Sequence, residues 1–292
     1  TNYMPELPEV EVVKKSLEKQ INNLTIKDVK IRDGNLRYKV KKQDINKIIG
    51  LKILKIKRRS KYLLFFLSQS FVMIVHFGMT GKFFIIRKNR TKQKTSFYYN
   101  IKENENNKHD RLTFFFNNNL KLVYNDVRKF GFIKVDLVKE IDENSHLKLL
   151  GPEPLSNFFN SNYFNQYLIG KKRIIKNLLM DQKFVSGLGN IYVNEILFLS
   201  KIKPNRKIEK LRETDIKNIL KNTKYVLKKA ILLGGSSIKD FAYSSGEKGN
   251  FQQHFKVYGR KGLNCSNKNC NGIIKKIEIS SRASFFCHNC QK

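Results

Sequence analysis

The chain has 292 residues, enough for one to three domains with a sizeable buried core. Lys and Arg number 58 against 24 Asp and Glu, which gives a formal net charge of +34 and a pI near 10. This excess, spread along the chain, excludes the charge balance of an ordinary globular protein. It favours a polyanionic partner, with the phosphate backbone of a nucleic acid ahead of an anionic membrane surface.

The sequence carries no pattern for export or membrane insertion. Its first twenty residues hold several Glu and Lys and no apolar core, so we expect no signal peptide. The most hydrophobic region, residues 62–86, is interrupted by polar residues and glycines, which favours buried strands over a membrane span. All four cysteines follow residue 264, unlike a secreted disulfide framework. We therefore expect a soluble intracellular protein.

The chain begins with a stretch rich in proline and glutamate, residues 4–11 (MPELPEVE). In one interpretation, Pro8 and the acids simply begin a helix, because they suit its first turn and its dipole. In the other, Pro5 becomes the first residue of the mature chain and carries a free secondary amine. An α-amino group has a pKa near ~8, so roughly a tenth of it is the uncharged nucleophile at neutral pH. Its attack on a sugar aldehyde carbon would give a cationic iminium, with Glu6 as the proton donor.

Hydrophobic periodicity then predicts three regions along the chain. An amphipathic helix is expected over residues 8–21. From residue 25 to about residue 138, short β-branched and aromatic runs between turns predict strands, which suggests a sandwich or barrel. These runs are residues 51–56, 62–67, 71–75, 83–86, 112–116, 120–124 and 130–135. After residues 151–154 the period becomes helical, with helices predicted over 163–169, 174–180, 191–200 and 214–233. Gly234 and Gly235 end the last of these.

The four cysteines form two pairs near the C-terminus. Cys265 and Cys270 are followed by Cys287 and Cys290, with a predicted hairpin over 272–279 and 283–286 between them. This spacing is typical of a structural zinc ribbon, so we expect one zinc ion bound by four thiolates. Two disulfides or a redox pair are the alternatives. Because about thirty residues cannot bury enough surface to fold alone, the metal would supply the stability.

At the turn of this hairpin, Arg282 follows two serines. An arginine at the tip of a zinc hairpin in a basic protein is a natural contact for a phosphate or a base. The plain alternative is a solvated turn residue.

Eight separated motifs, taken together and in order, resemble the bacterial formamidopyrimidine-DNA glycosylases. They lie at residues 5–11, 58–64, 76–81, 126–131, 150–155, 187–192 and 257–262, and in the cysteine tail that ends at residues 287–292. The resemblance covers essentially the whole chain from Met4 onward. It implies a multidomain α+β fold. A catalytic β-sandwich with flanking helices is expected over 5–140, a helix–two-turn–helix DNA-binding domain over 150–240, and a zinc finger hairpin over 256–292.

The resemblance also implies a reaction. The family excises oxidised purines, chiefly 8-oxoguanine and formamidopyrimidines, from duplex DNA in base-excision repair, and then cleaves the abasic site by β- and δ-elimination. By this resemblance Pro5 forms a Schiff base with the sugar and Glu6 protonates the sugar ring oxygen. Lys61 would donate a proton and contact the lesion phosphate, and Arg282 would hold phosphate during the second elimination. We expect a monomer that acts on DNA in the cytoplasm, at a bacterial or organellar nucleoid.

Further residues match positions of the family that contact DNA. Removing a base from the stack leaves a void, and the matching void-filling set combines an apolar plug, a hydrogen-bond donor and a wedging ring. These three residues are Met79, Arg128 and Phe130. Positions that bind the DNA backbone are matched by His109, Lys171, Asn190, Lys239 and Tyr258. Asn190 is expected just before the helix that starts at residue 191, where a helix N-terminus receives phosphate. Residues 241–255 correspond to the segment that closes over the lesion.

Two features of the sequence depart from the family pattern. Residues 1–4 precede Pro5, which with them attached is an amide and cannot form an iminium; either translation starts at Met4 and the methionine is removed, or the chain is extended or unprocessed. The first cysteine pair has four intervening residues where the family usually has two.

The alternative functions are an endonuclease VIII-type glycosylase for oxidised pyrimidines, a non-catalytic binder of damaged DNA, and a basic zinc protein that coats nucleic acid.

Overall fold

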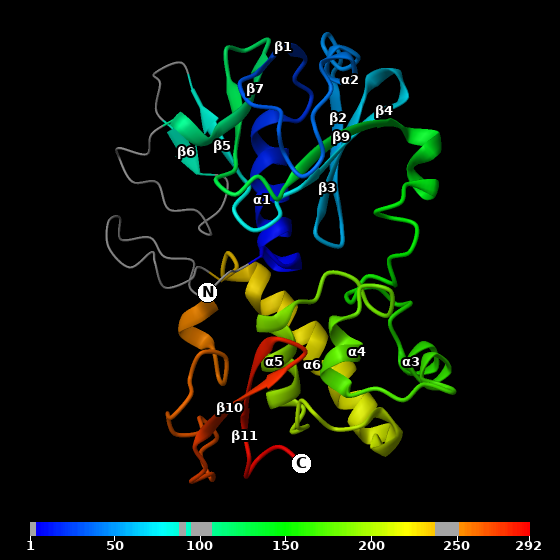
Figure 1. Ribbon diagram of the computed structural model, residues 1–292, viewed down its shortest axis with the longest axis vertical. Coiled ribbons are helices and arrows are strands. Elements are labelled where there is room, and N and C mark those ends of the chain that lie inside the picture. Colours follow the sequence, from blue (N-terminus) through cyan, green and yellow to red (C-terminus); the bar gives the residue numbers. More distant parts are fainter. Residues whose placement is uncertain (1–3, 88–91, 95–106, 237–250) are drawn as a thin grey trace. The chain divides into compact units, whose positions relative to one another are not determined.

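The computed structural model describes residues 4–87, 92–94, 107–236 and 251–292. The chain divides into two compact units (Figure 1). The first comprises Thr1–Lys148 together with Leu233–Asn250, and the second comprises Leu149–Leu232 together with Phe251–Lys292. The helical region and the cysteine module therefore belong to the same unit. No helix in the described part of the chain is long and apolar enough to cross a bilayer.

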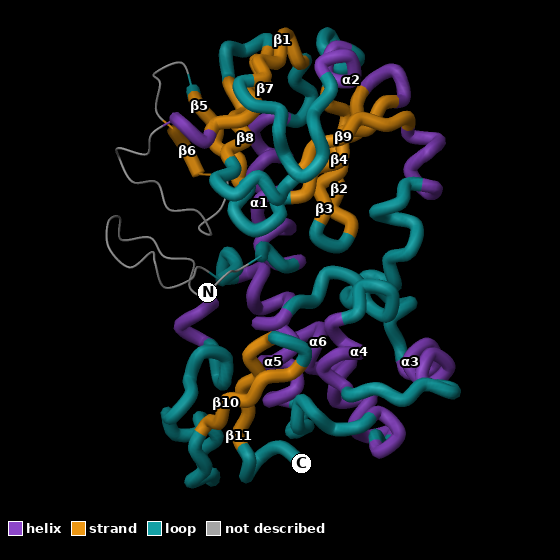
Figure 2. Tube along the Cα trace, in the orientation of Figure 1, coloured by secondary structure: helices purple, strands orange, loops and turns teal. Residues whose placement is uncertain are grey.

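Two antiparallel sheets build the first unit (Figure 2). One sheet has the strand order β1-β7-β8-β5-β6, and the other has the order β2-β3-β4-β9. The strands are β1 Ile26–Ile31, β2 Ile53–Arg59, β3 Tyr62–Leu67, β4 Phe71–His76, β5 Lys82–Ile86, β6 Lys92–Lys94, β7 Asp110–Phe116, β8 Lys121–Asn125 and β9 Phe132–Leu137. The unit also contains the helices α1 Leu7–Ile21 and α2 Lys42–Asn46. The expected N-terminal β-sandwich is confirmed.

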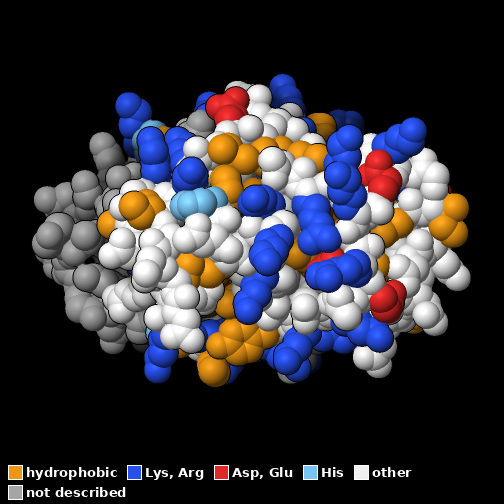
Figure 3. All heavy atoms as spheres, turned by 90° about the horizontal axis from the view of Figure 1, so that it is seen from below, with side chains coloured by type: hydrophobic (Ala, Val, Ile, Leu, Met, Phe, Trp, Pro, Cys, Tyr) orange, Lys and Arg blue, Asp and Glu red, His pale blue; other side chains and the backbone are white. Residues whose placement is uncertain are grey.

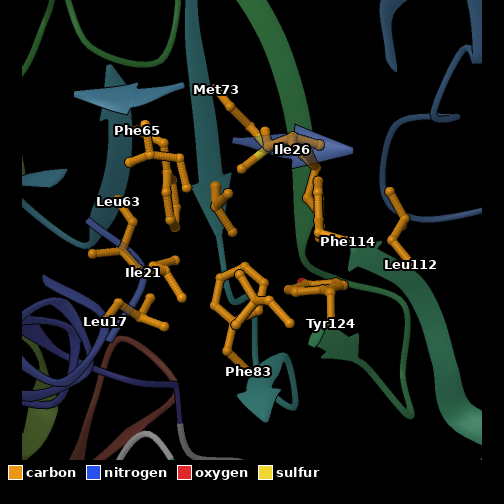
Figure 4. Packing of buried hydrophobic residues seen from close by; sticks show 14 of the residues in the cluster. Leu17, Ile21, Ile26, Leu63, Phe65, Met73, Phe83, Leu112, Phe114 and Tyr124 are labelled. Atoms are coloured by element: carbon orange, nitrogen blue, oxygen red, sulfur yellow. The ribbon is translucent and has the colours of Figure 1, made fainter. Parts of the chain in front are cut away.

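The core of the first unit lies between the two sheets (Figure 4). Phe65 of β3 and Phe83 of β5 come from different sheets, and their ring centroids are 6.0 Å apart. Helix α1 packs against β2 and β3 and adds Leu17 and Ile21 to the same buried cluster. Each such side chain stabilises the fold by roughly 1.5–3 kcal/mol when fully buried. This helix, whose first residues follow Pro5 and Glu6, is thus fixed on the four-stranded sheet.

The second unit is helical, with a small hairpin. Its helices are α3 Ser161–Leu168, α4 Ile175–Met180, α5 Asn190–Leu199 and α6 Glu213–Leu232. Helix α5 packs against α4, α6 and the hairpin, and residues 191–198 are all buried. The long helix α6 is amphipathic, because the positions buried along it recur at helical spacing on one face. The helical region expected after residue 154 is confirmed.

The hairpin consists of β10 Ile274–Ile279 and β11 Arg282–Cys287. Ser280 and Ser281 form its turn, and both have positive φ angles, of 50° and 58°. Two-residue turns of this kind match the twist of the flanking strands. Arg282 is therefore the first residue after the turn, paired with Ile279.

Candidate active site and nucleic-acid interface

The stretch that carries Pro5 and Glu6 begins helix α1, and both residues are buried. Glu6 is the N-cap of α1 and forms a capping box with Glu9. In it the backbone N–H of Glu6 donates to Oε2 of Glu9 at 3.0 Å. The other oxygen of Glu9, Oε1, accepts hydrogen bonds from the backbone N–H of Ser236 at 2.8 Å and from its hydroxyl at 2.9 Å. The Glu9 carboxylate therefore joins this stretch to the segment that follows α6.

Lys61 lies in the tight turn between β2 and β3, where Ser60 has a φ angle of 56°. An arginine on β2 fixes this turn: Nε of Arg58 donates to Oε2 of Glu11 at 2.8 Å, and its Nη1 donates to the Ser60 carbonyl at 2.9 Å. Burial alone would raise the pKa of Glu11, but the hydrogen bond and charge of Arg58 outweigh it and hold that pKa below its usual value. An ion pair thus ties the turn of Lys61 to helix α1.

His76 ends β4 and opens the turn that carries Met79. Burial, followed by the positive charges of Lys61 and Arg37, lowers the pKa of His76 to about 3, so its ring is neutral at pH 7. The Nδ1 atom accepts a hydrogen bond from the Gly78 N–H at 3.1 Å. The ring of His76 therefore holds the first part of the turn, and Met79 at its tip is half-buried.

The loop of residues 126–131 lies directly against this turn. A Cβ atom on Gly78 would collide with the backbone of Phe130 and Gly131, so only glycine permits this approach. Arg128 and Phe130 are exposed, and Cζ of Arg128 lies 4.7 Å from the centroid of the Phe130 ring. The structure thus brings together the segments that carry the three predicted void-filling residues.

His109 ends the short 3-10 helix Asn107–His109 and is half-buried. Its carbonyl accepts the N–H of Asp126 at 3.0 Å, which places it beside the 126–131 loop. Its Nδ1 lies 3.4 Å from Nη2 of Arg111, whose Nη1 pairs with Asp33 at 2.8 Å. His109, a predicted contact to the DNA backbone, therefore lies in the same part of the first unit as the 126–131 loop.

In the second unit, Asn190 and the start of β11 lie side by side. Asn190 is the first residue of α5 and Gly189 is its N-cap, one position earlier than the sequence indicates. The Nδ2 atom of Asn190 donates to the carbonyl of Ala283 at 3.0 Å. Arg282, the neighbour of Ala283, is exposed. The structure thus brings together two predicted phosphate contacts that are far apart in the chain.

Side chains that the sequence analysis missed hold the hairpin in this place. The buried Nζ of Lys176 donates to the Ala283 carbonyl at 3.1 Å and to Oγ of Ser284 at 2.6 Å. From α5, Oδ1 of Asn194 accepts the Phe285 N–H at 2.7 Å. No local signal marks these residues, because a single lysine in α4 and a single such asparagine in the apolar helix α5 have no recognisable spacing.

The remaining residues predicted to contact the DNA backbone are Lys171, Tyr258 and Lys239. Nζ of Lys171 donates to the Tyr167 carbonyl at 2.6 Å and lies 4.0 Å from the centroid of its ring. The N–H of Tyr258 donates to Oε1 of Glu195 at 2.8 Å, and burial raises the pKa of this glutamate despite three backbone donors. Lys239 lies outside the described residues, as do residues 241–250 of the predicted capping segment.

The four cysteines converge on one point in the second unit. Their sulfur atoms all lie within 4.8 Å of one another, with Cys265 to Cys290 at 3.7 Å and Cys270 to Cys287 at 3.6 Å. A tetrahedral metal with bonds of about 2.3 Å to sulfur requires edges of about 3.8 Å, which these distances fit. A Cβ atom on Gly272 would lie only 2.7 Å from the Cys287 sulfur, so the backbone also closes tightly around the group. The four thiols can bind a metal ion.

Two family models match successive parts of the chain. The family model described as the formamidopyrimidine-DNA glycosylase N-terminal domain matches residues 4–133. The model described as the formamidopyrimidine-DNA glycosylase H2TH domain matches residues 150–242. The two matches cover the sandwich and the helical region.

Similar proteins extend over the whole chain. A formamidopyrimidine-DNA glycosylase of Rickettsia bellii is 40% identical over 289 residues, covering 99% of this chain and 100% of its own. One of Hydrogenovibrio crunogenus is 39% identical over 290 residues, covering 99% and 97%. Among solved structures, a mutant of the Lactococcus lactis FPG in complex with DNA containing Fapy-dG superposes with a TM-score of 0.84 at 35% identity, covering 99% and 100%.

A second complex, of the Lactococcus lactis protein with DNA containing an abasic site, superposes with a TM-score of 0.83 at 35% identity and covers 98% of this chain and 99% of its own. Relatives of this identity and coverage, together with both family models, leave no part of the described fold without a counterpart. The chain therefore belongs to the formamidopyrimidine-DNA glycosylase family, whose members are DNA glycosylases.

Proposed function

We propose that this protein excises oxidised purines, chiefly 8-oxoguanine and formamidopyrimidines, from duplex DNA and cleaves the resulting abasic site by β,δ-elimination. One observation carries the proposal: a whole-length relative of the same fold, the Lactococcus lactis protein, is seen bound to DNA that contains an abasic site and, as a mutant, to DNA that contains Fapy-dG. An oxidised-purine lesion and its excision product are therefore both ligands of this relative.

In the proposed reaction the amine of Pro5 attacks the sugar carbon that bears the damaged base, and the base leaves. Glu6 protonates the sugar ring oxygen as the ring opens, which yields the Schiff base. The burial of both residues at the start of a capped helix supports this role, since a fixed nucleophile and its proton donor lose little entropy on reaction. The amine exists only in protein that begins at Pro5.

We further propose that Lys61 and Arg282 contact phosphate during the eliminations, and that Met79, Arg128 and Phe130 fill the void left by the extruded nucleotide. Arg128 and Phe130 are exposed next to the turn of Met79, which supports a joint insertion into the stack. His109, Lys171, Asn190, Lys239 and Tyr258 are proposed contacts to the DNA backbone.

The proposed metal is one structural zinc ion held by the four cysteines. Bound there, it would stabilise the hairpin that presents Arg282, because so small a module gains its folding energy from the metal. The ion has no proposed part in the chemistry.

Charge supports DNA as the partner. Lys and Arg side chains are spread over the face drawn in Figure 3, in keeping with the net charge of +34. Neutralising phosphates releases counterions, which favours binding without selecting a sequence. With DNA as its substrate, we propose a monomer that works at the nucleoid in the cytoplasm.

Borohydride trapping on a duplex with 8-oxoguanine opposite cytosine tests the proposal, with the intact mass of the protein measured on the same sample. We expect a covalent protein–DNA adduct from protein that begins at Pro5 and none from protein that begins at Thr1. A duplex carrying an oxidised pyrimidine serves as the control substrate and should trap more slowly. If protein that begins at Pro5 is loaded with zinc and binds the duplex without an adduct, the protein is a damage binder and the proposal is wrong.

A further inference from the structure

A buried carboxylate links three segments of the first unit that carry proposed DNA contacts. Asp126 is 0% exposed, and each of its polar groups has a partner. Its N–H donates to the His109 carbonyl at 3.0 Å, and its own carbonyl accepts Nε of Arg111 at 2.8 Å. Its Oδ2 accepts the Gly131 N–H at 2.9 Å, and its Oδ1 accepts the hydroxyl of Thr80 at 2.5 Å.

The hydroxyl of Thr80 connects this carboxylate to the exposed end of the loop. While it donates to Asp126, the same oxygen accepts the backbone N–H of Arg128 at 2.9 Å. Thr80 directly follows Met79 in the chain. The Thr80 hydroxyl therefore lies one residue from Met79, the proposed plug, and is hydrogen-bonded to the backbone of Arg128, the proposed donor of the void-filling set.

The chemistry of the two side chains suits this arrangement. A hydroxyl both donates and accepts, whereas an ionised carboxylate only accepts and can serve the Thr80 hydroxyl and the Gly131 N–H at the same time. A buried polar group left without a partner is costly, and separating the two loops would remove the Thr80 hydroxyl from the fully buried Asp126 carboxylate. The close approach of Gly78 to the backbone of Phe130 also holds the two loops against each other.

We propose that Thr80 and Asp126 are positioning residues that fix the Met79 turn and the Arg128–Phe130 loop as one rigid insert, so that plug, donor and wedge enter the DNA stack together. The inference rests on the proposed function, because it assumes that these residues fill a void in duplex DNA. Neither Thr80 nor Asp126 touches DNA in this scheme. A preformed insert loses little conformational entropy on binding, and loops that move independently must be ordered at each insertion.

The test separates insertion from the chemistry of the sugar. Rates of borohydride trapping are compared on a duplex with 8-oxoguanine opposite cytosine and on a single-stranded oligonucleotide with an abasic site, which has no stack to fill. The variants are Thr80→Val, which removes the hydroxyl at nearly constant shape, and Thr80→Ser, which keeps it. Expressing each rate as the ratio of duplex to single strand cancels any loss of folded protein.

We expect Thr80→Val to lower this ratio about threefold to tenfold, the range that corresponds to the loss of one hydrogen bond. Thr80→Ser should restore the wild-type ratio. An unchanged ratio in Thr80→Val, or a loss in Thr80→Ser as large as in Thr80→Val, would overturn the inference.

The variant Arg128→Ala, measured in the same assay, tells whether an unchanged ratio in Thr80→Val means that the positioning role is wrong or that the proposed void-filling role is wrong. If Arg128→Ala lowers the ratio and Thr80→Val does not, the void-filling role stands and the positioning role is wrong. If neither variant lowers it, the void-filling role is itself wrong and the inference falls with it.

Discussion

The neutral ring of His76 makes the stability of the sandwich depend on pH. Its pKa is about 3 in the folded protein, where burial and then the charges of Lys61, Arg37 and His146 disfavour protonation, against 6.5 for an ordinary histidine. Between these two values the unfolded chain binds a proton that the folded chain does not. The contribution of the neutral His76 ring to the free energy of unfolding is therefore fully present above pH 6.5 and is lost as the pH falls toward 3. At about 1.4 kcal/mol per pH unit, lowering the pH from 7 to 5 should cost about 2 kcal/mol.

Urea unfolding of the wild type and of His76→Gln at pH 7 and pH 5 measures this term. The glutamine keeps a carbonyl that can accept the Gly78 N–H but does not titrate. The free energy of unfolding of the wild type should fall by about 2 kcal/mol more than that of the variant over this interval. Because His254 is exposed, His254→Gln should behave like the wild type. Equal losses in the wild type and in His76→Gln would refute the assignment of a neutral His76 ring with a lowered pKa.

Two further predictions concern the second unit. Removal of metal with a chelator should lower the unfolding temperature and abolish the duplex trapping rate, and added Zn²⁺ should restore both; unchanged melting after complete metal removal would contradict a structural ion. Lys176→Met should lower the free energy of unfolding by about 1–3 kcal/mol in thermal unfolding, because the Ser284 hydroxyl and the Ala283 carbonyl each lose the hydrogen bond that Lys176 donates. The exposed Lys172→Met is the matched control, and equal effects of the two changes would contradict this role for Lys176.

Local patterns were sufficient to predict most of the elements. The apolar spacing after Pro8 predicts α1, and the structure has it from Leu7 to Ile21. The cysteine spacing predicts the four-thiol cluster, and the hairpin lies between the two pairs as expected. These features depend on neighbours within one element or one turn, so the periods of helix and strand are enough to find them.

The strand β1, Ile26–Ile31, was not singled out in the sequence. Only its first residue is buried, and the others are partly or largely exposed, so the alternation that identifies a half-buried strand is missing. The strand forms because β7 supplies a partner 80 to 90 residues further along the chain, as in the pairing of Ile26 with Phe116. Pairing with a distant edge overrides a weak local pattern.

The side chains that organise the candidate site were missed for the same reason. Glu9 accepts hydrogen bonds from a residue 227 positions away, Lys176 donates to one 108 positions away, and Thr80 and Asp126 are 46 positions apart. Glu9, Thr80 and Asp126 lie inside motifs that resemble the family, but none of the four residues has a local spacing that identifies its distant partner. Only the folded backbone shows that each is buried or half-buried and has distant partners.

These long-range polar contacts bear on how a protein of such charge can be selective. A net charge of +34 attracts any duplex, because counterion release does not distinguish damaged from undamaged DNA. Selectivity must instead come from groups held in fixed positions, since phosphate contacts orient a protein and contacts in the stack discriminate. In the first unit Asp126 holds the exposed insert, and in the second Lys176 and Asn190 hold the hairpin of Arg282. In the proposed scheme, the buried polar residues therefore fix, within each unit, the few exposed side chains that distinguish damaged from undamaged DNA.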